Sequence, residues 1–217
     1  AITRILRVKY DLGLFDDPYG KAERASQVGS DKNRQIARDA VKMSMVLLKN
    51  ESNVLPLKKD KSITVVGSGA NNLGMQNGGW TVEWQGRSTP DFKILDNNND
   101  GKLNLDEVTS HFKSAYDAKY DAGNVEGFFK NLDKDSNGDV NEDEFKKFIT
   151  ESPYQPDGTS ILKALEKASD KKGLITYDPR AEKISNEDII VAVVGENPYA
   201  EGIGDNPTIG LSSFDAA

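Results

Sequence analysis

The sequence predicts an α/β fold in which a partial parallel sheet with its helices is interrupted by an all-helical insert. Two short apolar runs, 62–66 and 188–194, are rich in Ile and Val and have the length of buried strands. A third short run at 174–177 and amphipathic stretches elsewhere give the strand and helix alternation that is typical of parallel sheets. The segment 91–156 departs from this pattern because it is strongly acidic, so we interpret it as an insert.

Two helices are predicted in the N-terminal part of the chain. Apolar residues spaced among Arg and Lys predict a short amphipathic helix over 2–10, and 11–20 is predicted to be a linker. A longer helix is expected to begin with Asp31 as its N-cap and to end near Asn50. Its broad apolar stripe predicts that it packs in the core.

The remaining segments follow the order strand, loop, insert, helix, strand, strand. The first strand leads into a Gly-Ser-Gly turn at 67–69, and the next segment, 71–86, holds both Trp residues among several Gly and Asn, which is typical of a loop. After the insert an amphipathic helix is predicted over 159–168.

Charge is unevenly distributed along the 217 residues. The formal net charge is −7, and 15 of the 35 acidic residues but only 8 of the 28 basic residues lie in 91–156. This excess of negative charge indicates cation binding by the insert. The same balance argues against a nucleic-acid partner, which requires a basic face. No apolar stretch approaches the roughly 18 residues of a membrane-spanning helix, so we expect no membrane contact.

Cysteine is absent from the chain, which excludes disulfide bonds, thiolate metal sites and Cys nucleophiles but leaves the compartment open. The N-terminus lacks the basic, apolar and small-residue regions of a signal peptide. We therefore expect the chain to be a mature or internal piece.

The first candidate calcium loop spans Asp96 to Glu107. Calcium prefers six to eight oxygen ligands, and a 12-residue EF-hand loop supplies them from positions 1, 3, 5, 7, 9 and 12, with Gly at position 6 for the turn. In this loop the six ligand positions are held by Asp96, Asn98, Asp100, Lys102 through its backbone carbonyl, Asn104 and Glu107.

The second candidate loop spans Asp133 to Glu144 and matches the same pattern. Its six ligand positions are held by Asp133, Asp135, Asn137, Asp139 through its backbone carbonyl, Asn141 and Glu144. The alternative is that both acidic runs are solvated turns. Two complete matches outweigh that alternative, so the sequence predicts two Ca²⁺ sites.

Apolar residues around the loops predict how the insert packs. Leu103 and Val140, at position 8 of each loop, are expected to pair the loops back to back. The flanking helices are expected to share a core made of Val108, Phe112, Phe128, Phe129, Leu132, Phe145, Phe148 and Ile149. The helix that enters the first loop must be short, because it follows Pro90, so we expect the first site to be the looser one. His111, on the helix that leaves this loop, is expected to be solvated.

Several segments outside the insert resemble glycoside hydrolase family 3. They are 1–15 (AITRILRVKYDLGLF), 37–50 (ARDAVKMSMVLLKN), 72–86 (NLGMQNGGWTVEWQG) and 195–206 (GENPYAEGIGDN), and the double-Trp segment is the most specific. The resemblance is to the exo-acting β-glucosidase and β-glucan glucohydrolase branch. It covers about 1–90 and 157–213 and has no counterpart for the insert.

The resemblance implies a domain organisation. Residues 1–30 would be the end of a barrel domain and a linker, 31–90 and 157–217 the first part of an α/β sandwich, and 91–156 the calcium-binding insert. In this family the nucleophile lies in the barrel and the acid/base Glu of this branch later in the sandwich. Since no Asp or Glu here matches either motif, none is assigned as catalytic, and the chain alone is expected to be inactive. Its partners would be the rest of the parent enzyme and a β-glucan or β-glucoside substrate.

The two Trp residues are the candidate sugar-binding residues. In this branch the second Trp of the Gly-Gly-Trp segment stacks on the leaving-group sugar, a role that the resemblance gives to Trp84, with Trp80 the weaker candidate. An indole plane suits this role because it packs against the C–H groups of a sugar face. Without the resemblance, burial in a core would be the more common role of a Trp.

Two further features have alternative interpretations. The turn at 67–69 suggests a dinucleotide or phosphate site, but it lacks the third Gly and the later acidic residue of that motif. Glu196, Glu201 and Asp205 follow a predicted strand at the sheet edge where ligands bind, and they either contact sugar or brace the loop.

The sequence therefore predicts part of a retaining exo-acting β-glucosidase or β-glucanase, which would be secreted or periplasmic. The insert would either hold the rim of the cleft in place or open on calcium loading and alter substrate entry. The alternative to the enzyme is a calcium-binding scaffold or sensor module without hydrolase activity.

Overall fold

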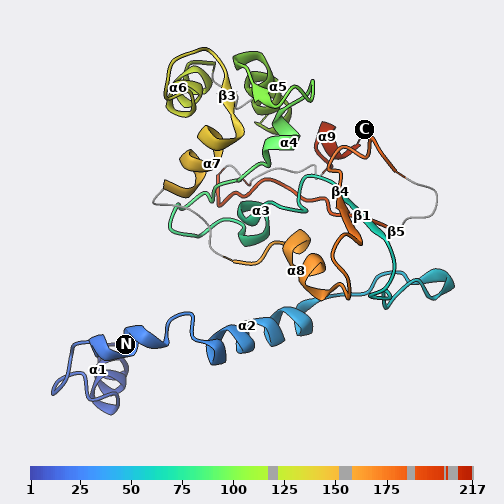
Figure 1. Ribbon diagram of the computed structural model, residues 1–217. Coiled ribbons are helices and arrows are strands. Elements are labelled where there is room, and N and C mark those ends of the chain that lie inside the picture. The colour runs from blue at the N-terminus through green and yellow to red at the C-terminus, as the bar shows by residue number, and fades with distance from the viewer. Residues whose placement is uncertain (117–121, 152–157, 185–188, 203, 205–209, 217) are drawn as a thin grey trace. The chain divides into compact units, whose positions relative to one another are not determined.

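The structure is a computed structural model that describes residues 1–116, 122–151, 158–184, 189–202, 204 and 210–216 (Figure 1). The chain divides into two compact units, Ala1–Pro56 and Leu57–Ala217. Among the described residues, no helix combines the length and the apolar composition that a membrane crossing requires. The predicted end of the insert at 156 lies outside the described residues.

The first unit consists of helices joined by turns. Its elements are α1 (Ile2–Asp11), the 3-10 helix η1 (Ala22–Gln27), α2 (Asp31–Ser44) and the 3-10 helix η2 (Glu51–Asn53). Helix α1 confirms the predicted N-terminal amphipathic helix. The segment after it continues in turns, as the predicted linker required.

Helix α2 corrects three predictions. Its N-cap is Ser30 and not Asp31, because the Ser30 hydroxyl accepts a hydrogen bond from the backbone N–H of Asn33. It ends at Ser44 rather than near Asn50, since Met45 has an extended backbone. The prediction of a core helix is wrong for the unit that contains α2, because none of its residues is buried there.

The second unit is built on a three-stranded parallel sheet with the order β4-β1-β5, which confirms the predicted fold class. The strands are β1 (Ile63–Val66), β4 (Ile175–Tyr177) and β5 (Ile189–Ala192), and Ile63 pairs with Ile175 on one side and Ile189 on the other. Every residue of β1 is buried because it lies between two neighbours. Strand β5, predicted to be buried, instead has alternate residues exposed, since in the described part it pairs only with β1.

Helix α8 (Ile161–Ala168) packs on the sheet through Leu162, where it contributes to a core with Ile63, Val65 and Ala70. Ser160 caps this helix by accepting from the backbone N–H of Lys163. This confirms the helix predicted over 159–168, with a start at Ile161 rather than at 159.

The insert forms two helix–loop–helix motifs joined by a short antiparallel ladder (Figure 1). Its elements are α4 (Phe92–Leu95), β2 (Lys102–Leu103), α5 (Leu105–Tyr116), α6 (Ala122–Leu132), β3 (Val140–Asn141) and α7 (Glu142–Glu151). Two further short helices belong to the second unit, α3 (Leu73–Asn77) and α9 (Ser213–Ala216).

All eight side chains predicted for the core of the insert belong to its apolar cluster. Buried members that complete it are Phe92, Leu95, Leu103, Val125 and Val140. Burial of this cluster fixes how the four helices flank the two loops, because the apolar faces of the helices can be removed from water only against one another.

Candidate calcium loops and aromatic loop

The first loop makes the sharp turn that its 12-residue pattern predicts. Positions 4 and 6, Asn99 and Gly101, have left-handed φ values of 58° and 80°. This turn directs the backbone N–H groups of Asp100 and Gly101 toward the Asp96 carboxylate, at 3.2 and 2.9 Å. Gly at position 6 allows the positive φ at little steric cost.

The second loop repeats this path. Ser136 and Gly138 occupy positions 4 and 6 with φ values of 59° and 92°. The Asp133 carboxylate accepts hydrogen bonds from the backbone N–H groups of Asn137 and Gly138, at 3.1 and 3.0 Å. Two segments with different sequences thus adopt one turn geometry, organised around the carboxylate at position 1.

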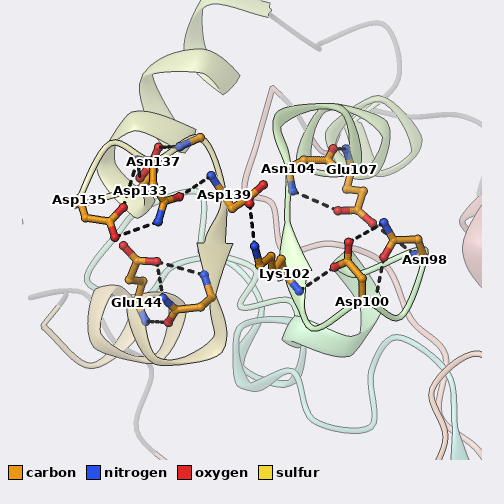
Figure 2. Close-up of polar contacts among 12 residues, drawn as sticks. Asn98, Asp100, Lys102, Asn104, Glu107, Asp133, Asp135, Asn137, Asp139 and Glu144 are labelled. Carbon is orange, nitrogen blue, oxygen red and sulfur yellow. Dashed lines mark hydrogen bonds and ion pairs between the residues drawn. The ribbon is translucent and has the colours of Figure 1, made fainter.

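The side chains at positions 3 and 5 also bend inward in both loops (Figure 2). In the first loop, Asn98 Oδ1 accepts from the N–H of Asp100, and Asp100 Oδ1 accepts from the N–H of Lys102. In the second loop, the same bonds run from Asn137 to Asp135 and from Asp139 to Asn137. The oxygens of these side chains are therefore gathered on the inner side of each turn.

Positions 9 and 12 close each loop in a reciprocal pair of bonds. Asn104 Oδ1 accepts from the Glu107 N–H while Glu107 Oε2 accepts from the Asn104 N–H, both at 3.0 Å. Asn141 and Glu144 form the same pair, also at 3.0 Å. These bonds place the long Glu side chain against the loop that it would close.

One difference separates the two closing carboxylates. Glu107 Oε1 also accepts hydrogen bonds from the backbone N–H groups of Asn97 and Asn98, so this side chain crosses the loop to its start and is 6% exposed. Glu144 is more exposed and lies with Asp133 and Asp135 in a group whose nearest oxygens are all within 4.8 Å of one another.

The two loops meet back to back at the ladder of β2 and β3. Leu103 pairs with Val140 and both side chains are fully buried, as their place at position 8 predicted. Beside them Lys102 Nζ forms an ion pair with Asp139 Oδ2 at 3.0 Å (Figure 2). The hydrogen bond to Asp139 raises the pKa of Lys102.

The donor set suits calcium. Oxygens on opposite sides of a bound Ca²⁺ ion lie about 5 Å apart, because each is about 2.3–2.6 Å from the ion, and the carboxylates of the second loop already approach one another this closely. Asp96, Glu107 and Asp133 are buried, and in the part of the chain that the structure describes no Lys or Arg forms an ion pair with them. Buried carboxylates without a cation are costly, which a bound cation would relieve.

His111 corrects a prediction. It is partly buried beside Phe112, their ring centroids being 6.1 Å apart, and it borders a small cavity with Ile94 and Phe214. Burial, assisted by the positive charge of Arg180, lowers the pKa of His111 to about 4. The imidazole is therefore neutral at pH 7 and packs as part of the interior, because α5 turns it toward the cavity that Ile94 and Phe214 line rather than toward water.

The aromatic loop, residues 78–86, carries both Trp side chains at the surface. Trp80 is 72% and Trp84 48% exposed, and their rings meet edge to face with centroids 6.1 Å apart. The backbone N–H of Trp80 donates to the carbonyl of Trp84 at 2.8 Å, which closes the loop into a tight turn. Two indole faces are thus available to a ligand and are not used in a core.

Gln85 fixes this loop to the segment that follows β5. Its Oε1 accepts from the N–H of Ala200 at 2.8 Å and its Nε2 donates to the carbonyl of Glu201. Gly79 lies so close to the Tyr199 carbonyl that a Cβ atom would approach it to 2.1 Å, which requires glycine at this point. The bracing role of Gln85 could not be predicted from the sequence, because its hydrogen-bond partners lie more than a hundred positions away.

The structure shows what surrounds the turn at 67–69 and the acidic residues that follow β5. The turn at 67–69 is filled by the chain itself: Asp215 accepts hydrogen bonds from the N–H and the hydroxyl of Ser68. Glu196 accepts from the Tyr199 hydroxyl at 2.7 Å, a contact that braces the loop and raises the pKa of Tyr199. Asp205 lies outside the described residues.

Comparison with known proteins gives the family. Residues 45–217 match the glycosyl hydrolase family 3 C-terminal domain. The chain is 38% identical over 90 residues to the lysosomal beta glucosidase of Dictyostelium discoideum, and 40% identical over 88 residues to the periplasmic beta-glucosidase of Salmonella typhimurium. These alignments cover 40% and 38% of this chain and 11% and 12% of those proteins.

A solved structure resembles the chain along most of its length. It is the exo-1,3/1,4-beta-glucanase of a Pseudoalteromonas species, with a TM-score of 0.52 and 28% identity, and the match covers 90% of this chain and 17% of that one. The chain thus spans about a tenth of the length of these two curated relatives and 17% of the solved structure. Since the family match covers most of the chain, the protein belongs to glycosyl hydrolase family 3, of which it carries the C-terminal domain.

Proposed function

We propose that the chain is part of a retaining, exo-acting β-glucosidase or β-glucanase, to which it contributes an aromatic wall of the sugar site and a calcium-binding insert. The observation that carries the enzymatic proposal is the family match over residues 45–217, together with relatives named as beta-glucosidases and an exo-glucanase. Retaining hydrolysis needs two carboxyl groups on either side of one bond. No Asp or Glu of this chain is assigned to that pair.

Trp84 is the residue of this chain that we propose contacts substrate. Its indole is half-exposed, is flanked by Trp80, and is held in place through the neighbouring Gln85. An exposed ring on a braced loop can stack on a sugar without first losing conformational freedom, which favours binding.

The experiment replaces Trp84 by Ala in the complete enzyme, with Trp80→Ala as the matched control, and measures hydrolysis of β-glucan oligomers. We expect Trp84→Ala to reduce kcat/KM by about tenfold, on the order of one lost stacking contact, and Trp80→Ala to reduce it less. Unchanged kinetics in Trp84→Ala would remove this residue from the site.

We also propose that the insert binds two Ca²⁺ ions, one in each loop. Support comes from the inward-turned oxygens of both loops and from buried carboxylates that have no cationic partner among the described residues. We favour a stabilising role, in which calcium removes conformational freedom from the insert, over a sensor role. The two roles differ in the complete enzyme: a stabilising ion raises the Tm more than the turnover, whereas a sensor changes turnover.

The proposed location is secreted or periplasmic, supported by the relative that is named a periplasmic beta-glucosidase. Extracellular calcium modules work with affinities of about 10⁻⁴–10⁻³ M, so constant occupancy there requires no tight site. The rival proposal is a calcium-binding scaffold without hydrolase activity. A complete protein that binds calcium yet leaves aryl β-glucosides uncleaved would favour that rival.

A further inference from the structure

Helix α4 enters the first loop but is too short to hold its own shape. It has four residues, Phe92–Leu95, and Asp96, the residue at its C-cap, is also position 1 of the loop. Isolated helices shorter than roughly 12 residues are marginal in water, because few hydrogen bonds offset the cost of starting the helix. The second loop is entered by α6, whose 11 residues carry an extensive apolar face.

Arg180 supplies hydrogen-bond donors to the C-terminal end of α4. Its guanidinium donates hydrogen bonds to the backbone carbonyls of Lys93 and Ile94, at 3.4 and 2.5 Å. It also donates to the side-chain oxygen of Asn97, which is position 2 of the loop. A helix leaves its last carbonyls without partners inside the helix, and a cation at this end satisfies them while it complements the helix dipole.

The position of Arg180 is itself fixed by the sheet. The N–H of Asp178 donates to the carbonyl of Val65 at 3.0 Å, and the N–H of Gly67 donates to the carbonyl of Pro179 at 3.1 Å. These bonds attach the segment that carries Arg180 to the end of β1. On its other side the guanidinium lies over the ring of Phe214, 5.4 Å from the centroid.

We infer that Arg180 is a positioning residue for the first calcium loop: it holds the end of α4 and Asn97 so that Asp96 and Asn98 face the ion. This inference rests on the proposed calcium function. It assigns a role that the 12-residue motif does not contain, since Arg180 lies 86 positions from Ile94. The second loop has Lys134 at the position of Asn97, and its entering helix needs no such support.

Arg180 can affect calcium binding in the first loop through its charge or through positioning. These two effects change the calcium affinity in opposite directions, so they can be told apart. If the guanidinium acted only through its charge, removing it would take a positive group away from a cation site and strengthen calcium binding. If it positions the loop, removing it weakens calcium binding there. Loss of such an outer-shell partner typically costs a metal site about 10–100-fold in affinity.

The control is Lys183, which borders the same cavity beside the first loop as Arg180 but is exposed, and whose side chain forms no hydrogen bond or ion pair with α4 among the described residues. The variants Arg180→Met and Lys183→Met each remove one positive charge. Arg180→Lys keeps the charge but not the planar fork that serves several acceptors at once. It also remains informative if Arg180→Met does not fold.

The readout separates the two loops. In the 217-residue chain, the backbone amides of Gly101 and Gly138 donate to the position 1 carboxylate of their own loop, so their NMR signals follow occupancy of each loop during a Ca²⁺ titration. We expect Arg180→Met to weaken calcium binding in the first loop by about tenfold or more, with the second loop unchanged. In Lys183→Met, calcium binding in the first loop should be unchanged or slightly tighter. In Arg180→Lys, calcium binding in the first loop should be weaker.

Three results would overturn the inference. Unchanged or stronger binding in the first loop of Arg180→Met, with both amides responding in the original chain, would refute the positioning role and leave the calcium sites standing. Equal weakening in both loops would show a general loss of structure. If neither amide of the folded original chain responded to calcium, the proposed calcium function would fail, and this inference with it.

Discussion

The two loops of the insert follow the same backbone path but differ in what supports them. The first is closed internally by Glu107, which reaches back to the N–H groups of Asn97 and Asn98, and externally by Arg180. The second is supported by its own long helix α6 and presents three converging carboxylates. The twelve residues of each loop therefore specify its turn, whereas the positions of its oxygens also depend on contacts from outside the loop.

The largest expected effect comes from the ladder that joins the loops. Leu103→Ala should lower the free energy of unfolding by about 3 kcal/mol, because the side chain is fully buried and its removal leaves a cavity. Val140→Ala, its partner in the second loop, should cost less because fewer atoms are removed. Urea unfolding of both variants without calcium measures the two losses in the free energy of unfolding. Equal small losses would mean that the ladder does not hold the loops together.

The closing carboxylates should differ in what their loss does. Glu107→Gln and Glu144→Gln should each weaken calcium binding in the altered loop by about 10–100-fold, or about 1.4–2.7 kcal/mol, because the carboxylate proposed as a bidentate ligand is lost. Without calcium, Glu107→Gln should also lower the Tm, since Glu107 makes the additional bonds across its loop. Titration calorimetry and thermal melts separate these effects. A Glu144→Gln melt that falls further than that of Glu107→Gln would contradict the comparison.

Features that depend on residues close together in the sequence could be predicted, and features that depend on contacts between distant segments could not. The proposed ligand positions depend on spacing within each twelve-residue loop. The pairing of Leu103 with Val140 follows from their shared place at position 8 of the two loops, so a repeated local pattern was enough to predict it. The strands were predicted because short runs of Ile and Val have few other uses. The roles of Arg180 and Gln85 could not be predicted, since each depends on contacts between distant segments with no motif of their own.

The wrong predictions have a related cause. Apolar periodicity predicts which face of α2 prefers burial, but not whether the unit Ala1–Pro56 supplies a segment that covers it. For His111, the sequence places it on α5 but does not show that the helix turns it toward Ile94 and Phe214. The amphipathic pattern thus gives the preference of a surface, and the tertiary contacts decide the outcome.

Acid should weaken the structure around the first loop. His111 has a folded pKa of about 4, below its ordinary value of 6.5, so the unfolded chain binds the extra proton first. Its contribution to stability is present above pH 6.5 and is lost as the pH falls toward 4. The whole pKa shift of His111 corresponds to about 3 kcal/mol in the free energy of unfolding. Because the side chain is only partly buried, we expect a loss on the order of 1–2 kcal/mol.

The measurement for His111 is the free energy of unfolding between pH 7 and pH 4, in calcium-free buffer, for the original chain and His111→Asn. The difference between the two chains should shrink as the pH falls, since Asn does not titrate. A difference that stays constant with pH would contradict the buried, neutral imidazole.

The smallest effect is expected for the ion pair between the loops. Both Lys102 and Asp139 are exposed, and such pairs are screened by water and salt. Lys102→Met should therefore leave the Tm nearly unchanged while it slightly strengthens calcium binding, because a positive charge leaves the neighbourhood of both sites. A marked fall in the Tm would mean that this pair, rather than the buried ladder, joins the loops.

Calorimetric titration of the metal-free 217-residue chain with Ca²⁺ tests the central claim most directly. Two ions per chain are predicted, with Mg²⁺ a poor competitor because the smaller ion requires a more rigid octahedral site. A correctly folded chain that binds no calcium, or that binds one ion outside the two loops, would contradict this account of the insert.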